Sequence, residues 1–457
     1  MAIELTFLGG SEEIGASSSY LYLNGSGIFF DAGLHPKKRD QNAFPSFELT
    51  ESKPTDILAV THAHTDHIGG IPYLLKYHPH LKVFMTEPTR DIAEIMLKDT
   101  AKILKSEIAL EFSDEILLLY KPEILKKIAV LMSAFKYDTP FRLKGRTGTT
   151  DISISFHHSG HILGSSSVLI ESGSFSLLHT GDIKFSDQQV IKKAIQPKRH
   201  VNTLVIESTN ANNPKLPTWQ TEKKRLGKYI NEIVNENGSV LIPCFALGKT
   251  QEVLKILHDL MIKGDIPHLP IYTGGLSDKI SLLYDKYCYT VPMVNPGFEI
   301  SDIPQKKILR SELMKGKYLR ESSIVVASSG MLHESTISFE LAKRWLRTPN
   351  FGVAFVGYQD PDGTGYALLN SLKNKEFKFG KIKSVRKCRV DQFRFSSHAS
   401  LEELVGFIDD IQPNNLFIVH GEEDSSEYLA MLVQQRHRNM RIILPEIGKS
   451  YMLFQEK

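Results

Sequence analysis

The sequence predicts an α/β protein built from more than one domain, and three observations carry this prediction. Short apolar runs separated by glycine and asparagine turns dominate residues 1–207. Apolar strand patterns alternate with helical patterns from 220 to about 385, and strand patterns return after 386. With 457 residues, the chain also exceeds the size that a single hydrophobic core usually supports.

The first segment, residues 1–207, is expected to be mostly β-structure with one helical interruption. Apolar residues at helical spacing, with Pro88 suited to a first helical turn, predict helices over 88–137. Strands are expected on both sides of it, at Ile3–Leu8, Ser19–Leu23, Gly27–Phe30, Asp56–Val60, Ile152–Phe156, Ser167–Ile170, Phe175–His179 and Thr203–Ile206.

The middle segment, residues 208–385, opens with loop chemistry and then alternates helices with strands, which is typical of βαβ units over a largely parallel sheet. Helices are expected at 220–236, 249–263, 276–287 and 336–347, and strands at Val240–Ile242, Ile324–Ala327 and Gly352–Val356. The last segment, 386–457, adds strands at Asn415–Val419 and Arg441–Leu444. Its polar motifs resemble those of the first segment. We therefore expect the middle to be an insertion and 386–457 to rejoin 1–207 in one domain.

Composition narrows the class of protein. Three widely spaced cysteines, Cys244, Cys288 and Cys388, argue against a disulfide framework and for a reducing, cytoplasmic compartment. We expect no membrane association, because no apolar run approaches the roughly 20 residues that cross a bilayer and no secretory signal is visible. The net charge of +3 is compatible with a polyanionic partner.

The strongest chemical signal is the segment Thr61-His62-Ala63-His64-Thr65-Asp66-His67, directly after an apolar run. A loop at a strand end can bring its four imidazole and carboxylate groups into a small volume. Helical or strand spacing would instead scatter them over opposite faces. Imidazole with carboxylate suits Zn²⁺, so the loop could begin two neighbouring metal sites.

Three further residues fit a metal centre. His161 stands in a glycine-flanked turn, where backbone can pack close to a site. Asp182 follows an apolar strand and a glycine, a position suited to a bridging ligand. Asp31, also at a strand end, is expected to orient the histidine loop through hydrogen bonds.

In this order, these residues resemble the successive motifs of the metallo-β-lactamase superfamily. Later segments resemble its β-CASP subfamily, and in particular the RNA-cleaving branch that includes the nuclease subunit of the cleavage and polyadenylation specificity factor. The segments that carry this resemblance are Glu207-Ser208-Thr209, the run 243–252, Ser328–Leu332, Phe355–Gln359, His398 and His420. A histidine at position 420 resembles the RNA-cleaving branch, whereas the DNA-repair branch typically has an apolar residue there.

The resemblance implies an αββα sandwich with an inserted β-CASP α/β domain, and two Zn²⁺ per chain, with Mn²⁺ as an alternative. One ion would be held by His62, His64 and His161. The other would be held by Asp66, His67 and His420, with Asp182 bridging the pair.

It also implies hydrolysis of RNA, expected to be single-stranded, by a metal-activated water. Asp66, Glu207 and His398 would be catalytic, with His398 protonating the departing oxygen while Glu207 holds its imidazole. Contacts to substrate are expected from Ser329, Gly330, Lys249 and His398. A buried, non-catalytic His398 and a purely structural Glu207 are the plainer alternatives.

Two basic runs, 373–389 and 306–320, are candidates for phosphate contact. In the first run, Phe377 and Phe379 stand between the cations and would suit base stacking. The alternative is that both runs are ordinary solvated faces.

Several functional alternatives stay open at the level of the sequence. The rival functions are a DNA nuclease with the same metals, a small-molecule metallohydrolase, and a non-catalytic RNA-binding subunit. The choice between endonucleolytic and 5′-exonucleolytic action, a homodimer, and RNA-processing partner proteins are likewise undecided. The loops after Glu207 and Leu332 depart from the family pattern, and their effect on substrate preference is open.

Overall fold

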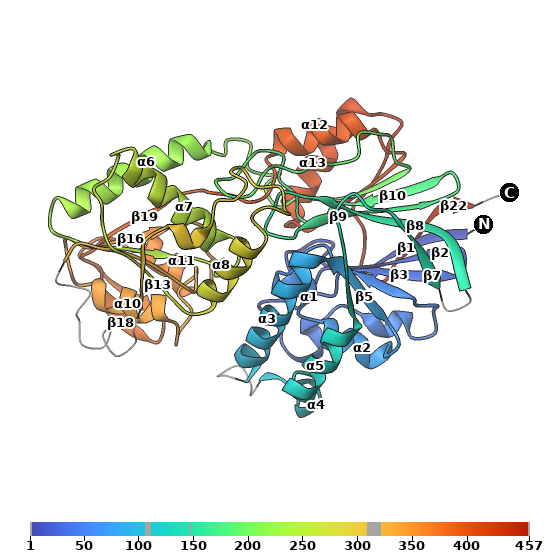
Figure 1. The fold of residues 1–457 in the computed structure, drawn as a ribbon, viewed down its shortest axis with the longest axis horizontal. Coiled ribbons are helices and arrows are strands. Elements are labelled where there is room, and N and C mark those ends of the chain that lie inside the picture. Colours follow the sequence, from blue (N-terminus) through green and yellow to red (C-terminus); the bar gives the residue numbers. More distant parts are fainter. Residues whose placement is uncertain (1, 106–110, 146–147, 309–320, 456–457) are drawn as a thin grey trace. The chain divides into compact units, whose positions relative to one another are not determined.

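The computed structural model describes residues 2–105, 111–145, 148–308 and 321–455. The chain forms two compact units (Figure 1). The first unit combines residues 1–186, 193–214 and 397–457, and the second combines 187–192 and 215–396. Three separate stretches of sequence therefore build the first unit. The sequence-based domain limits at 207/208 and 385/386 stay predictions.

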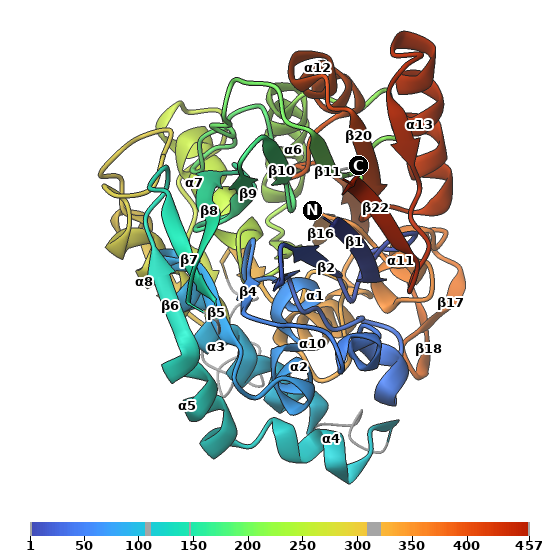
Figure 2. The ribbon, with the colours of Figure 1, turned by 90° about the vertical axis from the view of Figure 1, so that its right-hand side faces the viewer.

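The first unit contains two β-sheets, each with seven strands in the described part of the chain. One sheet has the strand order β22 (Ser450–Gln455), β1 (Ala2–Gly9), β2 (Ser18–Leu23), β3 (Ser26–Phe30), β4 (Ile57–Ala59), β5 (Lys82–Thr86), β6 (Met132–Phe135). The other has the order β21 (Arg441–Ile443), β20 (Asn415–Val419), β11 (Thr203–Glu207), β10 (Phe175–His179), β9 (Ser166–Ser172), β8 (Gly148–His158), β7 (Phe141–Gly145). The first and last described strands lie side by side, because β22 pairs antiparallel with β1 (Figure 2).

The two sheets enclose one apolar core, which includes Phe7, Phe156 and Phe417. A second apolar cluster lies between the other face of the second sheet and two helices near the end of the chain. The helices of this unit are α1 (Thr65–Ile68), α2 (Ile71–Tyr77), α3 (Glu87–Leu104), α4 (Asp114–Leu119), α5 (Pro122–Leu131), α12 (Leu401–Ile411) and α13 (Glu423–Arg436). The helix α3 packs on β5 and β6, while α12 and α13 cover the second sheet. This is the expected αββα sandwich.

The helical prediction for residues 88–137 was wrong at its end. The first part is helical, and Pro88 lies in the first turn of α3. Residues Met132–Phe135, however, form the edge strand β6, which pairs in parallel with β5. Because this short run directly follows α5, its apolar residues continue the helical spacing of that helix. Only the pairing partner, nearly fifty residues earlier in the chain, makes it a strand.

The second unit is built on a parallel sheet, as the alternating pattern predicts. Its described strands follow the order β14 (Gln305–Lys307), β13 (Ile271–Thr273), β15 (Ile324–Ala327), β12 (Val240–Pro243), β16 (Gly352–Phe355), β19 (Arg389–Gln392). All its pairings are parallel. A separate antiparallel hairpin joins β17 (Glu376–Phe379) to β18 (Ile382–Val385). The helices are α6 (Trp219–Val234), α7 (Lys249–Ile262), α8 (Leu276–Lys286), α10 (Ile337–Trp345) and α11 (Thr364–Leu369).

Two expectations from composition concern the whole chain. Among the described residues, no helix combines the length and apolar character required to cross a membrane. Cys244, Cys288 and Cys388 are buried free thiols.

Candidate metal centre

Strand ends of the first unit deliver the polar side chains to one place. Asp31 directly follows β3, and the loop 61–67 follows β4, its parallel neighbour. In the second sheet, Asp182 follows β10, Glu207 ends β11 and His420 follows β20. These three strands are parallel neighbours, so their carboxyl ends meet at the same edge.

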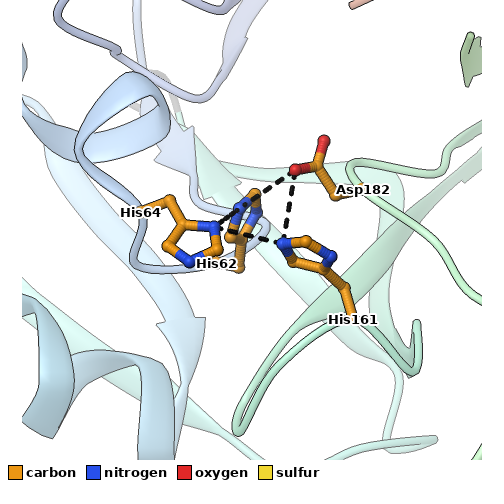
Figure 3. A group of neighbouring side chains, drawn as sticks. All are labelled: His62, His64, His161 and Asp182. Atoms are coloured by element: carbon orange, nitrogen blue, oxygen red, sulfur yellow. Dashed lines mark hydrogen bonds and ion pairs between the residues drawn. The ribbon is translucent and has the colours of Figure 1, made fainter. Parts of the chain in front are cut away.

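The first group of side chains consists of His62, His64, His161 and Asp182, whose ligand atoms lie within 4.8 Å of one another. Nδ1 of His64 lies 3.1 Å from Nε2 of His62 and 3.1 Å from Nε2 of His161. Both Nε2 atoms lie 3.4 Å from Oδ2 of Asp182 (Figure 3). Three imidazoles and one carboxylate oxygen thus face a common point, which is a donor set suited to zinc.

The second group consists of Asp66, His67 and His420. Nε2 of His67 lies 3.3 Å from Nε2 of His420. Oδ2 of Asp66 lies 3.4 Å from Nε2 of His420 and 3.9 Å from Nε2 of His67. Both histidines are buried, while Asp66 is partly exposed.

Asp182 lies between the two groups. Its Oδ2 faces His62 and His161, whereas its Oδ1 lies 3.1 Å from Nδ1 of His420 and 3.5 Å from Nε2 of His67. This Oδ1 atom is buried and accepts no hydrogen bond from any described residue. A buried carboxylate oxygen that accepts no hydrogen bond is costly unless a cation satisfies it. The residues present therefore fit two adjacent metal ions that share Asp182.

The charges of this cluster also favour cations. Burial opposes a charge on His67, yet the carboxylates of Asp182, Asp31 and Asp66 together raise its pKa to about 10. Burial lowers the pKa of His62 and of His161 well below the ordinary value, and neighbouring histidines lower both further. Neutral imidazole is the form that ligates a metal, and metal binding displaces protons from such groups. The cluster thus offers neutral imidazole nitrogens that can bind a metal ion, together with a surplus of negative charge from its carboxylates.

Groups behind the cluster fix the ligands in place. Asp31 accepts hydrogen bonds from the backbone N–H and the hydroxyl of Thr61, both at 2.7 Å, and lies 2.7 Å from Nδ1 of His67. Nδ1 of His161 donates to the carbonyl oxygen of Ser397 at 3.0 Å. Sequence reasoning missed Ser397, because a backbone carbonyl leaves no signal in the residue type.

His398 and Glu207 form a third, adjoining group with Asp182. Nδ1 of His398 lies 2.9 Å from Oε2 and 3.0 Å from Oε1 of Glu207. Glu207 is fully buried, and its Oε1 also accepts the backbone N–H of Ile183 at 2.8 Å. Burial would raise the pKa of Glu207, but the charge and hydrogen bond of His398 hold it below its ordinary value.

Comparison with known proteins places this geometry in a family. Three family models match in succession: "Metallo-beta-lactamase superfamily" over 13–216, "Beta-Casp domain" over 250–368 and "Zn-dependent metallo-hydrolase RNA specificity domain" over 385–445. The "Transcription termination factor FttA" of Methanocaldococcus jannaschii is 30% identical over 92% of this chain and 67% of its own length. The chain belongs to the β-CASP group of the metallo-β-lactamase superfamily.

Other β-CASP relatives are similar over most of this chain. An "RNase J-like protein" of Methanocaldococcus jannaschii is 28% identical over 94% of the chain and 95% of its own length. The "Endoribonuclease YSH1" of Kluyveromyces lactis is 27% identical over 91% of the chain, which spans only 55% of that protein. A crystal structure of a protein of unknown function from Enterococcus faecalis shares the fold, with a TM-score of 0.56 at 14% identity over 99% of this chain and 100% of that chain.

The substrate-contact residues predicted for the β-CASP segment lie in the second unit. The hydroxyl of Ser329 accepts the backbone N–H of His333 at 2.9 Å, and the carbonyl of Gly330 accepts from Gln359 at 3.0 Å. Lys249 is buried and donates to the carbonyl oxygen of Phe395. Its phosphate contact, like those of Ser329 and Gly330, stays a prediction.

The structure describes one of the two basic runs in full and the other only in part. Of the run 306–320, positions 309–320 lie outside the described residues. In the run 373–389, Phe379 is fully buried and stacks on Phe339 with ring centroids 4.9 Å apart. The expectation that Phe379 stacks on bases is therefore wrong, because its ring belongs to the apolar core of the second unit.

Proposed function

We propose that this protein is a metal-dependent ribonuclease that hydrolyses phosphodiester bonds of single-stranded RNA. The observation that carries the proposal is the placement of Asp182, whose two oxygens face two separate groups of ligands. Two metal ions a few ångströms apart are the arrangement that in-line phosphodiester hydrolysis uses. Relatives named as endoribonuclease and as RNase J-like support RNA as the substrate.

The proposed cofactors are two Zn²⁺, with Mn²⁺ as an alternative. His62, His64 and His161 would hold one ion, Asp66, His67 and His420 the other, and Asp182 both. Imidazole-rich sets of this kind suit zinc, and the single carboxylate that both groups share balances part of the charge. When bound, the pair supplies Lewis acidity toward water and toward the scissile phosphate.

The chain's own residues provide the proton for the leaving group. His398 has Nδ1 directed at Glu207, so Nε2 is the atom that would hold a proton for the departing oxygen. The Glu207 carboxylate, kept ionised by its surroundings, fixes the ring orientation and stabilises the charged imidazole. Asp66, in the group with His67 and His420, would take part in catalysis as a ligand of the second metal ion.

The remaining predictions belong to the same proposal. Ser329, Gly330 and Lys249 would contact the RNA phosphates, and the three free thiols favour a reducing, cytoplasmic location. A homodimer and RNA-processing partner proteins stay predictions from the sequence. The chain spans about half the length of the endoribonuclease it matches.

The test is digestion of single-stranded RNA labelled at its 5′ or 3′ end, with 5′-phosphate and 5′-triphosphate versions. We expect cleavage that a chelator abolishes and that added Zn²⁺ or Mn²⁺ restores. Asp182→Asn should lose both activity and bound metal, whereas Asp187→Asn, an aspartate outside the cluster, should retain both. Cleavage of matched DNA in preference to RNA, or of a lactone or thioester alone, would overturn the proposal.

A further inference from the structure

The hairpin formed by β17 and β18 presents one partly buried and one exposed face. Phe377 pairs with Ser384 and Phe379 with Ile382, and this face includes the fully buried Phe379. Lys378 pairs with Lys383 on the opposite, exposed face. We call residues 373–387 the basic hairpin; Figure 1 labels its strand β18 beside α10, and Figure 2 labels both strands.

The exposed face carries a surplus of positive charge. Glu376 is the single acidic residue of the basic hairpin. Six of its lysines are exposed, namely Lys373, Lys375, Lys378, Lys381, Lys383 and Lys387. Glu376 lies 3.4 Å from Lys383, and Glu334 of a neighbouring segment lies 3.5 Å from Lys381. Four of the six exposed lysines therefore lie outside these two ion pairs.

The pairing of Lys378 with Lys383 sets two like charges directly opposite each other. Like charges at such a cross-strand position are destabilising, by a few tenths to about 1 kcal/mol. Glu376, 3.4 Å from Lys383, offsets only one of these two charges within the hairpin. A bound polyanion would remove the repulsion, since each phosphate would neutralise a lysine.

The hairpin is held firmly enough to act as a surface. The backbone N–H of Asn374 donates to the carbonyl oxygen of Arg386 at 2.7 Å, closing the base of the hairpin. The backbone N–H of Lys387 donates to the carbonyl of Leu346 at 2.6 Å, next to the exposed Arg347. The stacking of Phe379 on Phe339 anchors the tip. The cations thus project from a fixed scaffold.

The aromatic rings of the hairpin are turned away from solvent. Phe379 is fully buried, and Phe377 is half-buried against it, with ring centroids 6.1 Å apart. Base recognition by stacking requires an exposed aromatic face. The exposed face instead offers ammonium groups, which contact phosphates irrespective of sequence.

We propose that the basic hairpin is a binding surface for the phosphate backbone of single-stranded RNA, separate from the metal ligands in sequence and in structural unit. The choice of RNA among polyanions rests on the proposed ribonuclease function. Because the exposed lysines contact phosphates and not bases, a DNA strand of equal length binds this surface similarly.

The test measures binding without cleavage. The full-length protein, in chelator, is titrated against a fluorescent 30-nucleotide oligo(U) at several KCl concentrations. Lys378→Gln/Lys383→Gln should weaken binding by about 10-fold at low salt and reduce the slope of log K against log [salt] by about 1.4, as expected for two lost phosphate contacts. Lys126→Gln/Lys127→Gln, which removes two exposed lysines from α5, should change neither quantity.

Two further measurements keep this proposal separate from the catalytic one. Lys378→Arg/Lys383→Arg should keep wild-type binding, because the charges persist. Oligo(A) and oligo(dT) should lose affinity in the glutamine variant as much as oligo(U) does. Unchanged affinity and slope in that variant, or a loss confined to one base, overturns the hairpin proposal. If the protein cut no RNA, the ribonuclease proposal would fail. The binding measurements would still test the hairpin proposal, because they do not depend on cleavage.

Discussion

Nδ1 of His67 lies 2.7 Å from Oδ2 of Asp31, and both side chains are buried. The same carboxylate accepts two hydrogen bonds from Thr61, the residue just before the first histidine of the loop. Asp31 therefore fixes the start of the loop and the ring of His67 at once. With Nδ1 engaged in this way, Nε2 of His67 is left to face His420 and Asp182.

Replacing Asp31 by Asn should weaken metal binding. The amide keeps the size of the side chain but removes the charge that orients and polarises His67, and losses of such groups typically cost 10–100-fold in metal affinity. Metal content measured after equilibration with a competing chelator checks this. Asp56→Asn is the matched control, since Asp56 accepts the backbone N–H of Gly27 away from the cluster. Equal affinities in the two variants would contradict the role given to Asp31.

His398→Gln should reduce the rate of RNA cleavage by about 10²–10⁴-fold, the usual contribution of a positioned general acid. The bound metal should remain, because the two ligand groups are complete without His398. Turnover and metal content are measured on the same preparation, with the exposed His200→Gln as control. Loss of metal together with activity would instead identify His398 as a ligand, and full activity would remove its catalytic role.

The stability of the protein should fall between pH 6.5 and pH 4 because of His78. Thr50 donates its hydroxyl to Phe47 and so accepts from Nε2 of His78, while Nδ1 lies 3.3 Å from the Thr55 hydroxyl. Burial, aided by His80, lowers the pKa of His78 to about 4. The unfolded chain, with an ordinary histidine pKa near 6.5, binds the proton more readily, so stability is lost as the pH falls through this window.

For this single group, the loss from pH 7 to pH 5 is about 2 kcal/mol. The check is the free energy of urea unfolding at both pH values, compared between the wild type and His78→Gln with metal in excess. The variant is less stable at pH 7 but has a shallower dependence on pH. Parallel pH profiles for the two proteins would refute the assignment.

Glu252→Ala should destabilise the second unit by about 3 kcal/mol, since buried donors left without an acceptor cost about 1–3 kcal/mol each before relaxation. The buried carboxylate accepts the backbone N–H groups of Gln189, Val190 and Ile191 at 2.6–3.0 Å. It thus holds residues 187–192 within the second unit. Urea unfolding and tryptic cleavage at Lys192 measure the effect. As a control, Glu232→Ala, at an exposed site, should change stability by no more than about 0.5 kcal/mol. If the Glu252 variant resisted trypsin as the wild type does, Glu252 would not be what holds residues 187–192 in place.

Much of the fold was predictable because its signals are local. The alternation after residue 220 predicts the parallel sheet, and Pro88 predicts the start of α3. The edge strand β6 was not predictable, because a four-residue apolar run has the same local pattern in a helix and in a strand. Phe379 was misjudged for a related reason, since its position between lysines conceals that the pleat turns it into the core.

By itself, the sequence determined which chemical groups are present and which of them follow strand ends. The tight spacing of His62, His64, Asp66 and His67 is a local property of one loop. Only the tertiary structure decided that Asp182 faces both groups with different oxygens, that Glu207 is turned toward His398, and that the carbonyl of Ser397 holds His161. The physical reason is that each of these contacts joins residues more than a hundred positions apart in the sequence. Parallel pairing of β10, β11 and β20 brings the ends that carry Asp182, Glu207 and His420 together.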